Sequence, residues 1–145
     1  MDARFCTFEV DSLLVGVPVD RVQEILRYQD VTRVPLVDRA VHGLINLRGQ
    51  IITAIDLRVR LQLPERQEHS ELMSVVIQNA DGAVSLLVDK IGEVVEVNHT
   101  QYERSPETLT GVAAALIPGT FKLPNRLLHV LDVSLAIEIG EPAIA

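Results

Sequence analysis

Alternating apolar and polar residues recur in short runs along the chain, and this pattern predicts strands. In residues 4–10, Cys6, Phe8 and Val10 fall on one face and polar side chains on the other, as in a half-buried strand. Residues 20–26 fit either a short helical turn or the start of another strand. Further apolar runs bounded by polar or turn-forming residues occur at 13–19, 72–78, 83–88, 94–97 and 127–131. The pattern predicts an all-β protein with a few short helices.

Residues 43–58 carry the strongest local signals. Runs rich in β-branched residues flank a polar centre, and Gly49 can adopt the positive φ that a short hairpin needs. We expect Gly43 and Gly49 to be the structural turn residues of this stretch. Asp56 then ends the second run, and its carboxylate can accept from the free N–H groups of a short helix at 57–61. The stretch predicts strand, turn, strand and helix.

An internal repeat indicates that the chain contains two related units. Both matches occur in the same order along the chain: 20–26 with 89–95, and 50–57 with 126–133. A unit of about 60 to 70 residues buries too small a fraction of its surface to be stable alone, so two packed copies are expected. A groove between the copies is a natural place for a partner to bind.

The repeat suggests one domain, residues 1–145, with two subdomains. The polar segment 63–71 is the best candidate boundary, which places the subdomains at approximately 12–63 and 72–137. The N-terminal strand at 4–10 and the C-terminal helix at 132–137 are the segments that could cross between them.

Composition agrees with a strand-rich core. Of the 145 residues, 48% are hydrophobic but only 3% are aromatic, so the core is expected to consist of Val, Ile and Leu. The apolar runs are interrupted by charge or proline well before the roughly 20 residues that span a bilayer, so we expect no direct membrane insertion. The single cysteine, Cys6, excludes an internal disulfide and fits a reducing cytoplasm.

The charge distribution argues against nucleic acid as a partner. The formal net charge is −7, and residues 64–145 carry the whole acidic excess. No concentrated basic face is evident, so a phosphate backbone would be repelled.

A search for catalytic patterns finds little. The histidines lack cysteine partners and short ligand spacings, so no metal site is expected: His42, His69, His99 and His129. No serine lies in a Gly-x-Ser-x-Gly pattern, and no glycine-rich phosphate loop is present. We therefore expect a binding module rather than an enzyme, with no cofactor. A small-ligand-binding or enzymatic barrel is the alternative from another functional class.

Residues 43–58 resemble the signature of the CheW family, which reads Gly-(Val/Ile)-Ile-Asn-Leu-Arg-Gly and ends in Asp-Leu-Arg. Residues 22–25, 31–35 and 87–89 are similar to further blocks of that family in the right order, and the resemblance extends over residues 4–137. It implies two five-stranded SH3-like barrels packed with a groove between them. It also implies a cytoplasmic adaptor that couples chemoreceptors to the histidine kinase CheA.

The resemblance also implies particular contact residues. Val22 and Ile45 would supply apolar contacts to a partner, and Glu24 and Arg48 would supply polar ones. The alternatives from residue type alone are that Val22 and Ile45 are core residues and that Arg48 is a solvated turn residue. Arg48 could also brace the groove by bonding Glu24 or another carboxylate.

The partners that the resemblance implies are the cytoplasmic tip of the chemoreceptors and the regulatory domain of a CheA-type kinase, with other CheW-like proteins in rings as a further possibility. The corresponding location is the receptor array on the inner face of the membrane. This chain departs from the family at Thr53, where proline is common, at 15–17, which lacks an aromatic residue, and across 111–124. These departures leave open whether the pathway is flagellar chemotaxis, pilus-based motility or another chemosensory pathway.

Overall fold

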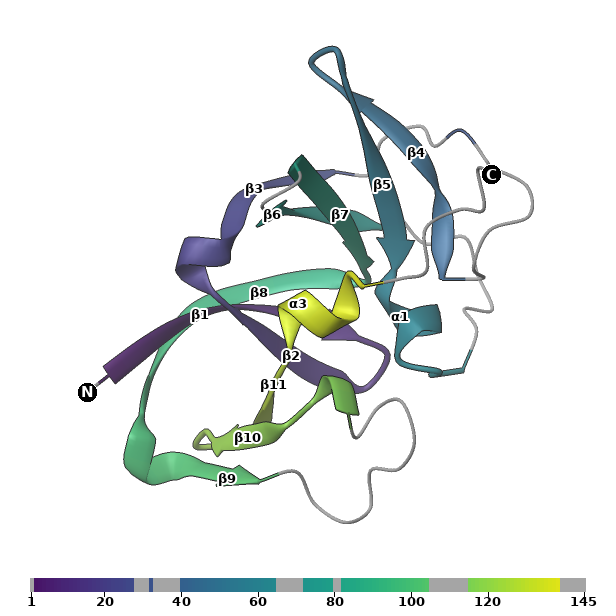
Figure 1. The fold of residues 1–145 in the computed structure, drawn as a ribbon. Coiled ribbons are helices and arrows are strands. Elements are labelled where there is room, and N and C mark those ends of the chain that lie inside the picture. Colours follow the sequence, from purple (N-terminus) through teal and green to yellow (C-terminus); the bar gives the residue numbers. More distant parts are fainter. Residues whose placement is uncertain are drawn as a thin grey trace.

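A computed structural model describes residues 2–27, 32, 40–64, 72–79, 82–104 and 115–138. Most of these residues are in strands, which form two sheets (Figure 1). The first sheet contains β3 (Val22–Arg27), β4 (Val41–Leu47), β5 (Gln50–Asp56), β6 (Met73–Asn79) and β7 (Gly82–Val88). The second contains β1 (Asp2–Val10), β2 (Leu13–Pro18), β8 (Lys90–Asn98), β9 (Tyr102–Arg104), β10 (Gly119–Lys122) and β11 (Leu127–Val130). The helical segments are α1 (Leu57–Arg60), α3 (Val133–Ala136) and the 3-10 turns η1 (Val19–Arg21) and η2 (His99–Gln101).

Each sheet closes on itself. The first has the order β3-β6-β7-β5-β4, and the chain beyond β3 returns to the far edge, where Thr32 and Leu44 exchange two backbone hydrogen bonds of 2.8 Å. The second has the order β8-β1-β2-β11-β10-β9, and β9 follows β8 through η2 to reach its far edge. In both sheets, one edge strand therefore continues to the opposite edge. We call the resulting units the first barrel and the second barrel.

The predicted all-β fold with two barrels is confirmed. Five strands per barrel is right for the first barrel. It is wrong for the second, which has six among the described residues because the short β9 is added. The 20–26 segment, for which two interpretations were open, is η1 followed by β3.

The two repeat units exchange their first hairpins. The β1–β2 hairpin pairs with β8 and, in parallel, with β11, whereas the β6–β7 hairpin pairs with β3 and, in parallel, with β5. Each barrel therefore combines strands from 12–63 with strands from 72–137. The repeat itself is visible after β5 and β11. Asp56 at the end of β5 and Asp132, two residues beyond β11, each cap a four-residue helix.

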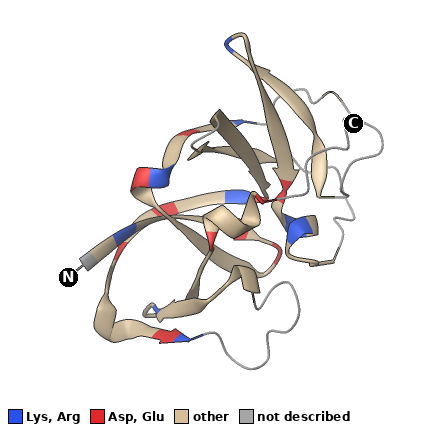
Figure 2. Ribbon diagram, in the orientation of Figure 1, with Lys and Arg blue, Asp and Glu red and all other residues tan. Residues whose placement is uncertain are grey.

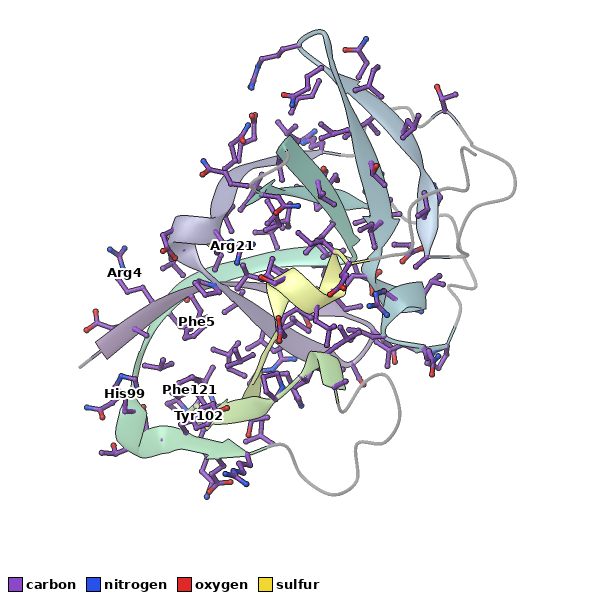
Figure 3. The ribbon with its side chains drawn as sticks, viewed as in Figure 1. Arg4, Phe5, Arg21, His99, Tyr102 and Phe121 are labelled. Carbon is purple, nitrogen blue, oxygen red and sulfur yellow. The ribbon has the colours of Figure 1, made fainter. Side chains whose placement is uncertain are left out.

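Apolar side chains form three clusters. One is shared by both barrels, one lies inside the first barrel and one inside the second. Adjacent residues of β6, Val75 and Val76, enter the shared core and the first-barrel core respectively, which explains why this strand is apolar on both faces. Inside the second barrel, Phe5 and Tyr102 both pack against Phe121, with ring centroids 5.6 and 5.1 Å from it (Figure 3). The barrels are thus joined by a buried apolar layer and each is also filled.

Some predicted segments lie outside the described residues. These are most of the 31–35 block, most of the 63–71 boundary segment, the start of the turn before Gly82, and part of 111–124.

Candidate functional site: the tip of the β4–β5 hairpin

The β4–β5 hairpin turns through Arg48 and Gly49. Leu47 pairs with Gln50, and the two residues between them have φ values of 52° and 86°, as in a two-residue type I′ turn. The Asn46 side-chain oxygen accepts from the Gly49 N–H at 2.9 Å and holds the turn closed. The predicted hairpin and the turn role of Gly49 are confirmed.

Gly43, which we expected at a turn, lies inside β4. The pairing between β4 and β5 shifts register between Val41 and Gly43, so the glycine sits at a β-bulge. Its φ of 157° is close to extended, which is why the strand continues through it. The prediction of a turn at Gly43 was wrong because a glycine before a strand signals a bulge as readily as a turn.

Arg48 makes a forked ion pair with Glu24. Its Nη1 donates to Oε2 at 2.6 Å and its Nη2 donates to Oε1 at 2.7 Å. Glu24 lies on β3, which is one edge of the first sheet, and Arg48 follows β4, which is the other edge. The pair therefore joins the two edges by side chains, as Thr32 and Leu44 join them by backbone. The bracing interaction that the sequence left open is present.

The two members of this pair differ in exposure. The Arg48 side chain is 70% exposed and that of Glu24 is 19% exposed. The Arg48 side chain thus presents most of its surface to solvent, and the less exposed Glu24 carboxylate fixes its orientation. Because a guanidinium has five donors and the fork uses two nitrogens on one carboxylate, it can still donate to a second acceptor.

The ion pair shifts both titrations toward the charged forms. The hydrogen bond from Arg48 lowers the pKa of the Glu24 carboxyl, and its positive charge adds to this effect against partial desolvation. The hydrogen bond from Glu24 raises the pKa of Arg48. Both groups are therefore ionised at neutral pH.

The backbone at Arg48 is strained. Its φ of 52° lies in the left-handed region, which disfavours residues with a Cβ and favours Gly or Asn in this type of turn. Residues held in such conformations cluster at functional sites. An arginine here is consistent with a selected side-chain function rather than with turn formation alone.

The other two predicted contact residues are less accessible. Ile45 is only 2% exposed and packs in the first-barrel core, and Val22 is half-buried against the shared core. The core interpretation of Ile45 therefore agrees with its burial. Two apolar residues that the sequence did not single out are exposed instead: Ile25 at 39% and Ile51 at 59%.

Ile25 and Ile51 both lie next to the ion pair in sequence or register. Ile25 follows Glu24 on β3, and Ile51 pairs with Asn46, one step from the turn. A signal for Ile51 was present, because strict alternation with buried Ile52 assigns it to the opposite face. The continuous apolar run at 51–52 hid this alternation.

No clustered metal ligands or long apolar helices are found in the described residues. No group of three or more His, Cys, Asp or Glu there is arranged to hold a metal ion. Within the same residues, no helix is long and apolar enough to cross a membrane. His129 is half-buried with its Nδ1 3.1 Å from the Leu14 carbonyl oxygen, and burial lowers its pKa.

Comparisons with known proteins identify the family of this chain. A family model described as "CheW-like domain" matches residues 4–140. The chain belongs to the CheW-like family. Within this family, it is 33% identical to the chemotaxis protein CheW of Bacillus subtilis over 93% of this chain and 86% of that protein. It is 31% identical to chemotaxis protein CheW of Treponema pallidum over 88% of this chain and 77% of that protein.

A solved CheW-like structure has the same fold. The scaffolding protein TtCheW from Thermoanaerobacter tengcongensis superposes with a TM-score of 0.84, covering 97% of this chain and 95% of that one. The sequence identity is 24%, so this likeness concerns the fold alone. The double SH3-like barrel that the resemblance implied is confirmed. The groove between the barrels stays a prediction.

Proposed function

We propose that this chain is a non-catalytic adaptor that couples chemoreceptors to a CheA-type histidine kinase. Membership of the CheW-like family and the naming of its relatives as chemotaxis proteins support this function. The observation that carries the proposal is the exposed Arg48 guanidinium, which a tight turn and a forked ion pair hold in one orientation. A preorganised donor loses little conformational entropy when it binds a partner.

In this proposal, the hairpin tip is part of the receptor-binding surface. Arg48 donates to a carboxylate or backbone carbonyl of the receptor tip, and Glu24 keeps the guanidinium oriented. Exposed Ile51 and half-buried Val22 add apolar contacts, because apolar side chains make up much of the area of protein interfaces. Ile45 acts from the core by supporting β4 beneath the turn.

The adaptor mechanism needs no covalent step. Two weak interfaces on one rigid body, one for the receptor tip and one for the kinase regulatory domain, raise the effective concentration of each partner for the other. The assembly is then tighter than either contact alone. The shared apolar core joins the two barrels into one body.

The proposed location is the cytoplasmic face of the membrane, in arrays that contain the receptors, the kinase and other CheW-like proteins in rings. The pathways that fit this proposal are flagellar chemotaxis, pilus-based motility and other chemosensory pathways. The neighbouring genes distinguish these pathways. Genes for receptors and a CheA-type kinase beside this one support chemotaxis, and genes for pilus components support pilus-based motility.

Calorimetric titration tests the proposal. The purified chain is titrated separately with the kinase regulatory domain and with a receptor-tip fragment from the same organism. We expect binding to both, and we expect Arg48→Ala to weaken only the receptor titration. Arg126→Ala is the matched control, because Arg126 is an exposed arginine whose ion pair with Glu9 lies within the second barrel. Absence of binding to either partner at high concentration contradicts the adaptor function.

A further inference from the structure

Helix α1 belongs to the first barrel but directs its arginines toward the second. The helix follows β5 directly, and the Asp56 carboxylate caps it by accepting from the Arg58 N–H at 3.0 Å. Leu57 is buried in the core that both barrels share, which fixes the helix at their junction. In Figure 2, the basic positions of α1 lie beside the acidic position at the end of β5. Arg58 and Arg60 leave the helix in position to reach other elements.

Arg58 reaches the crossing point of the two barrels. Its Nη2 lies 2.9 Å from Oδ2 of Asp89, between β7 and β8, and 3.4 Å from Oδ1 of Asp11, in the β1–β2 turn. Its Nη1 donates to the Pro64 carbonyl at 3.0 Å. Asp89 also accepts from the Asp11 N–H at 2.6 Å, and its own N–H donates to the Glu9 carbonyl at 3.0 Å. One guanidinium thus ties α1 to the strand crossing and to a second-barrel turn.

The Arg58 contact is largely shielded from water. The Arg58 side chain is 14% exposed and that of Asp89 is 16% exposed. Its Nε is buried without a hydrogen-bond partner among the described residues. This lowers the stability of the fold, because a buried polar atom without a partner has lost its hydrogen bonds to water. The contacts of Nη1 and Nη2 offset this cost. The contribution of Arg58 therefore depends on the positions of the groups that these two nitrogens contact.

Arg60 reaches the C-terminal end of α3, which follows the last strand of the second barrel. Its Nε donates to the Ala136 carbonyl at 3.0 Å and its Nη2 donates to the Leu135 carbonyl at 2.9 Å. A carbonyl oxygen has two lone pairs, so the Leu135 carbonyl, which also accepts from the Glu138 N–H at 3.2 Å, can still accept from the guanidinium. This contact is independent of the Arg58 contact because the two have no acceptor in common.

The repeat shows that this arrangement is one-sided. In the matching of 50–57 with 126–133, continued by three residues, Ser134 and Ala136 of α3 occupy the places of Arg58 and Arg60. The second unit therefore has the same capped helix without cations. The arginines are not needed to form such a helix, so their role concerns what α1 contacts.

We propose that Arg58 and Arg60 act as a clamp that sets the orientation of the second barrel relative to the first. The shared core attracts the barrels without strong directional preference, because apolar contact is non-directional. Two guanidinium groups on one helix, bonded to separate second-barrel elements, define a direction. The functional role of the clamp rests on the proposed function. Arg58 and Arg60 are then positioning residues that keep the receptor interface and the kinase interface in a fixed relative orientation.

Distance measurements between spin labels test the clamp directly. With Cys6 replaced by alanine, exposed Gln50 and Glu96 are changed to cysteine for an inter-barrel pair, and exposed Glu96 and Asn125 for a pair within the second barrel. Double electron–electron resonance then compares the distance distributions of the parent with those of Arg58→Met, Arg60→Met and the double variant. Arg126→Met is the control for loss of an arginine.

We expect the inter-barrel distance distribution to shift and broaden in both single variants and most in the double variant. The intra-barrel distribution should not change, and neither should either distribution in Arg126→Met. If loss of Arg58 unfolds the chain, Arg60→Met still tests the clamp. This variant removes only the two hydrogen bonds from Arg60 to carbonyls, so we expect it to fold. An unchanged inter-barrel distribution in folded Arg60→Met and double variants overturns the clamp.

The functional consequence has its own readout. In clamp variants, we expect each partner to bind alone within about twofold of the parent, whereas the gain in kinase binding on adding receptor falls by at least about fivefold. If the parent binds neither partner, the proposed function fails while the distance result still decides the clamp. If the parent couples both partners and the double variant couples them equally well, the positioning role is overturned.

Discussion

Arg48 shows how one residue can carry a backbone cost for the sake of its side chain. Its left-handed φ of 52° would suit glycine or asparagine. Its guanidinium nevertheless forms a fork with Glu24, and the side chain as a whole is 70% exposed. Turn geometry and side-chain chemistry are therefore separable by substitution at this position.

Arg48→Gly and Arg48→Ala separate these two contributions. Both remove the fork, but glycine accepts the left-handed conformation and alanine is strained there. We expect both variants to weaken receptor-tip binding equally, by about tenfold or more, since the guanidinium is the contact group. We expect Arg48→Gly to have the higher Tm. Titration calorimetry and thermal unfolding measure the two effects, and normal receptor binding by Arg48→Gly contradicts a role for the side chain.

The Glu24 carboxyl provides a pH-dependent test of the same ion pair. Because the hydrogen bond from Arg48 lowers its pKa in the folded state, the pair stabilises the fold above the ordinary pKa of Glu, 4.5, and this stabilisation is lost as pH falls through the folded-state pKa. Carboxyl-carbon NMR titration should give a pKa below 4.5 in the parent and a higher value in Arg48→Gln. Equal values in the two proteins would mean that the fork does not persist in solution.

At the scale of elements, short-range signals were readable and long-range pairings were not. The β4–β5 hairpin and its capped helix were predicted, because Gly49 and Asp56 act on their immediate neighbours. The exchange of hairpins between barrels was not predicted, because strands with apolar residues on both faces fit either sheet. The Arg58–Asp89 contact joins residues 31 apart in sequence, and nothing local marks them as partners.

The candidate site was partly predictable for the same reason. The position of Arg48 in a tight turn followed from local pattern, and its bond to Glu24 was one of the stated possibilities. The burial of Ile45 and the exposure of Ile25 depend on which strands flank them, so residue type alone could not separate contact residues from core residues.

The aspartate caps of α1 and α3 give a prediction at this scale. Asp132 accepts from the Leu135 N–H at 3.0 Å, so Asp132→Ala should lower the free energy of unfolding by about 1 kcal/mol, as loss of an N-cap typically does. Asp132→Asn should retain most of the stability because asparagine caps nearly as well. Urea unfolding of both variants, with exposed Ser134→Ala as control, measures the difference. Equal loss in the Ala and Asn variants would point to charge rather than capping.

At the scale of the whole molecule, hairpin exchange makes the two repeat units mutually dependent. The first barrel takes β6 and β7 from the second unit, and the second barrel takes β1 and β2 from the first. Neither unit can complete a sheet with its own strands. We therefore expect the chain to unfold as one cooperative domain rather than as two independent ones.

Cutting the chain between the units tests this dependence. Fragments 1–68 and 69–145 should each lack cooperative unfolding alone and should regain it when mixed, because each supplies the hairpin that the other barrel needs. Circular dichroism and urea titration of the separate and mixed fragments provide the measurement. Cooperative unfolding of either fragment alone contradicts the mutual dependence of the units.

In the proposed function, this chain holds two partners at once. Sedimentation velocity of the chain, the kinase regulatory domain and a receptor-tip fragment together measures this most directly. We expect a species that contains all three components, disappears when the chain is omitted and is reduced by Arg48→Ala. Only two-component species, with the partners competing for the chain, would contradict the adaptor function.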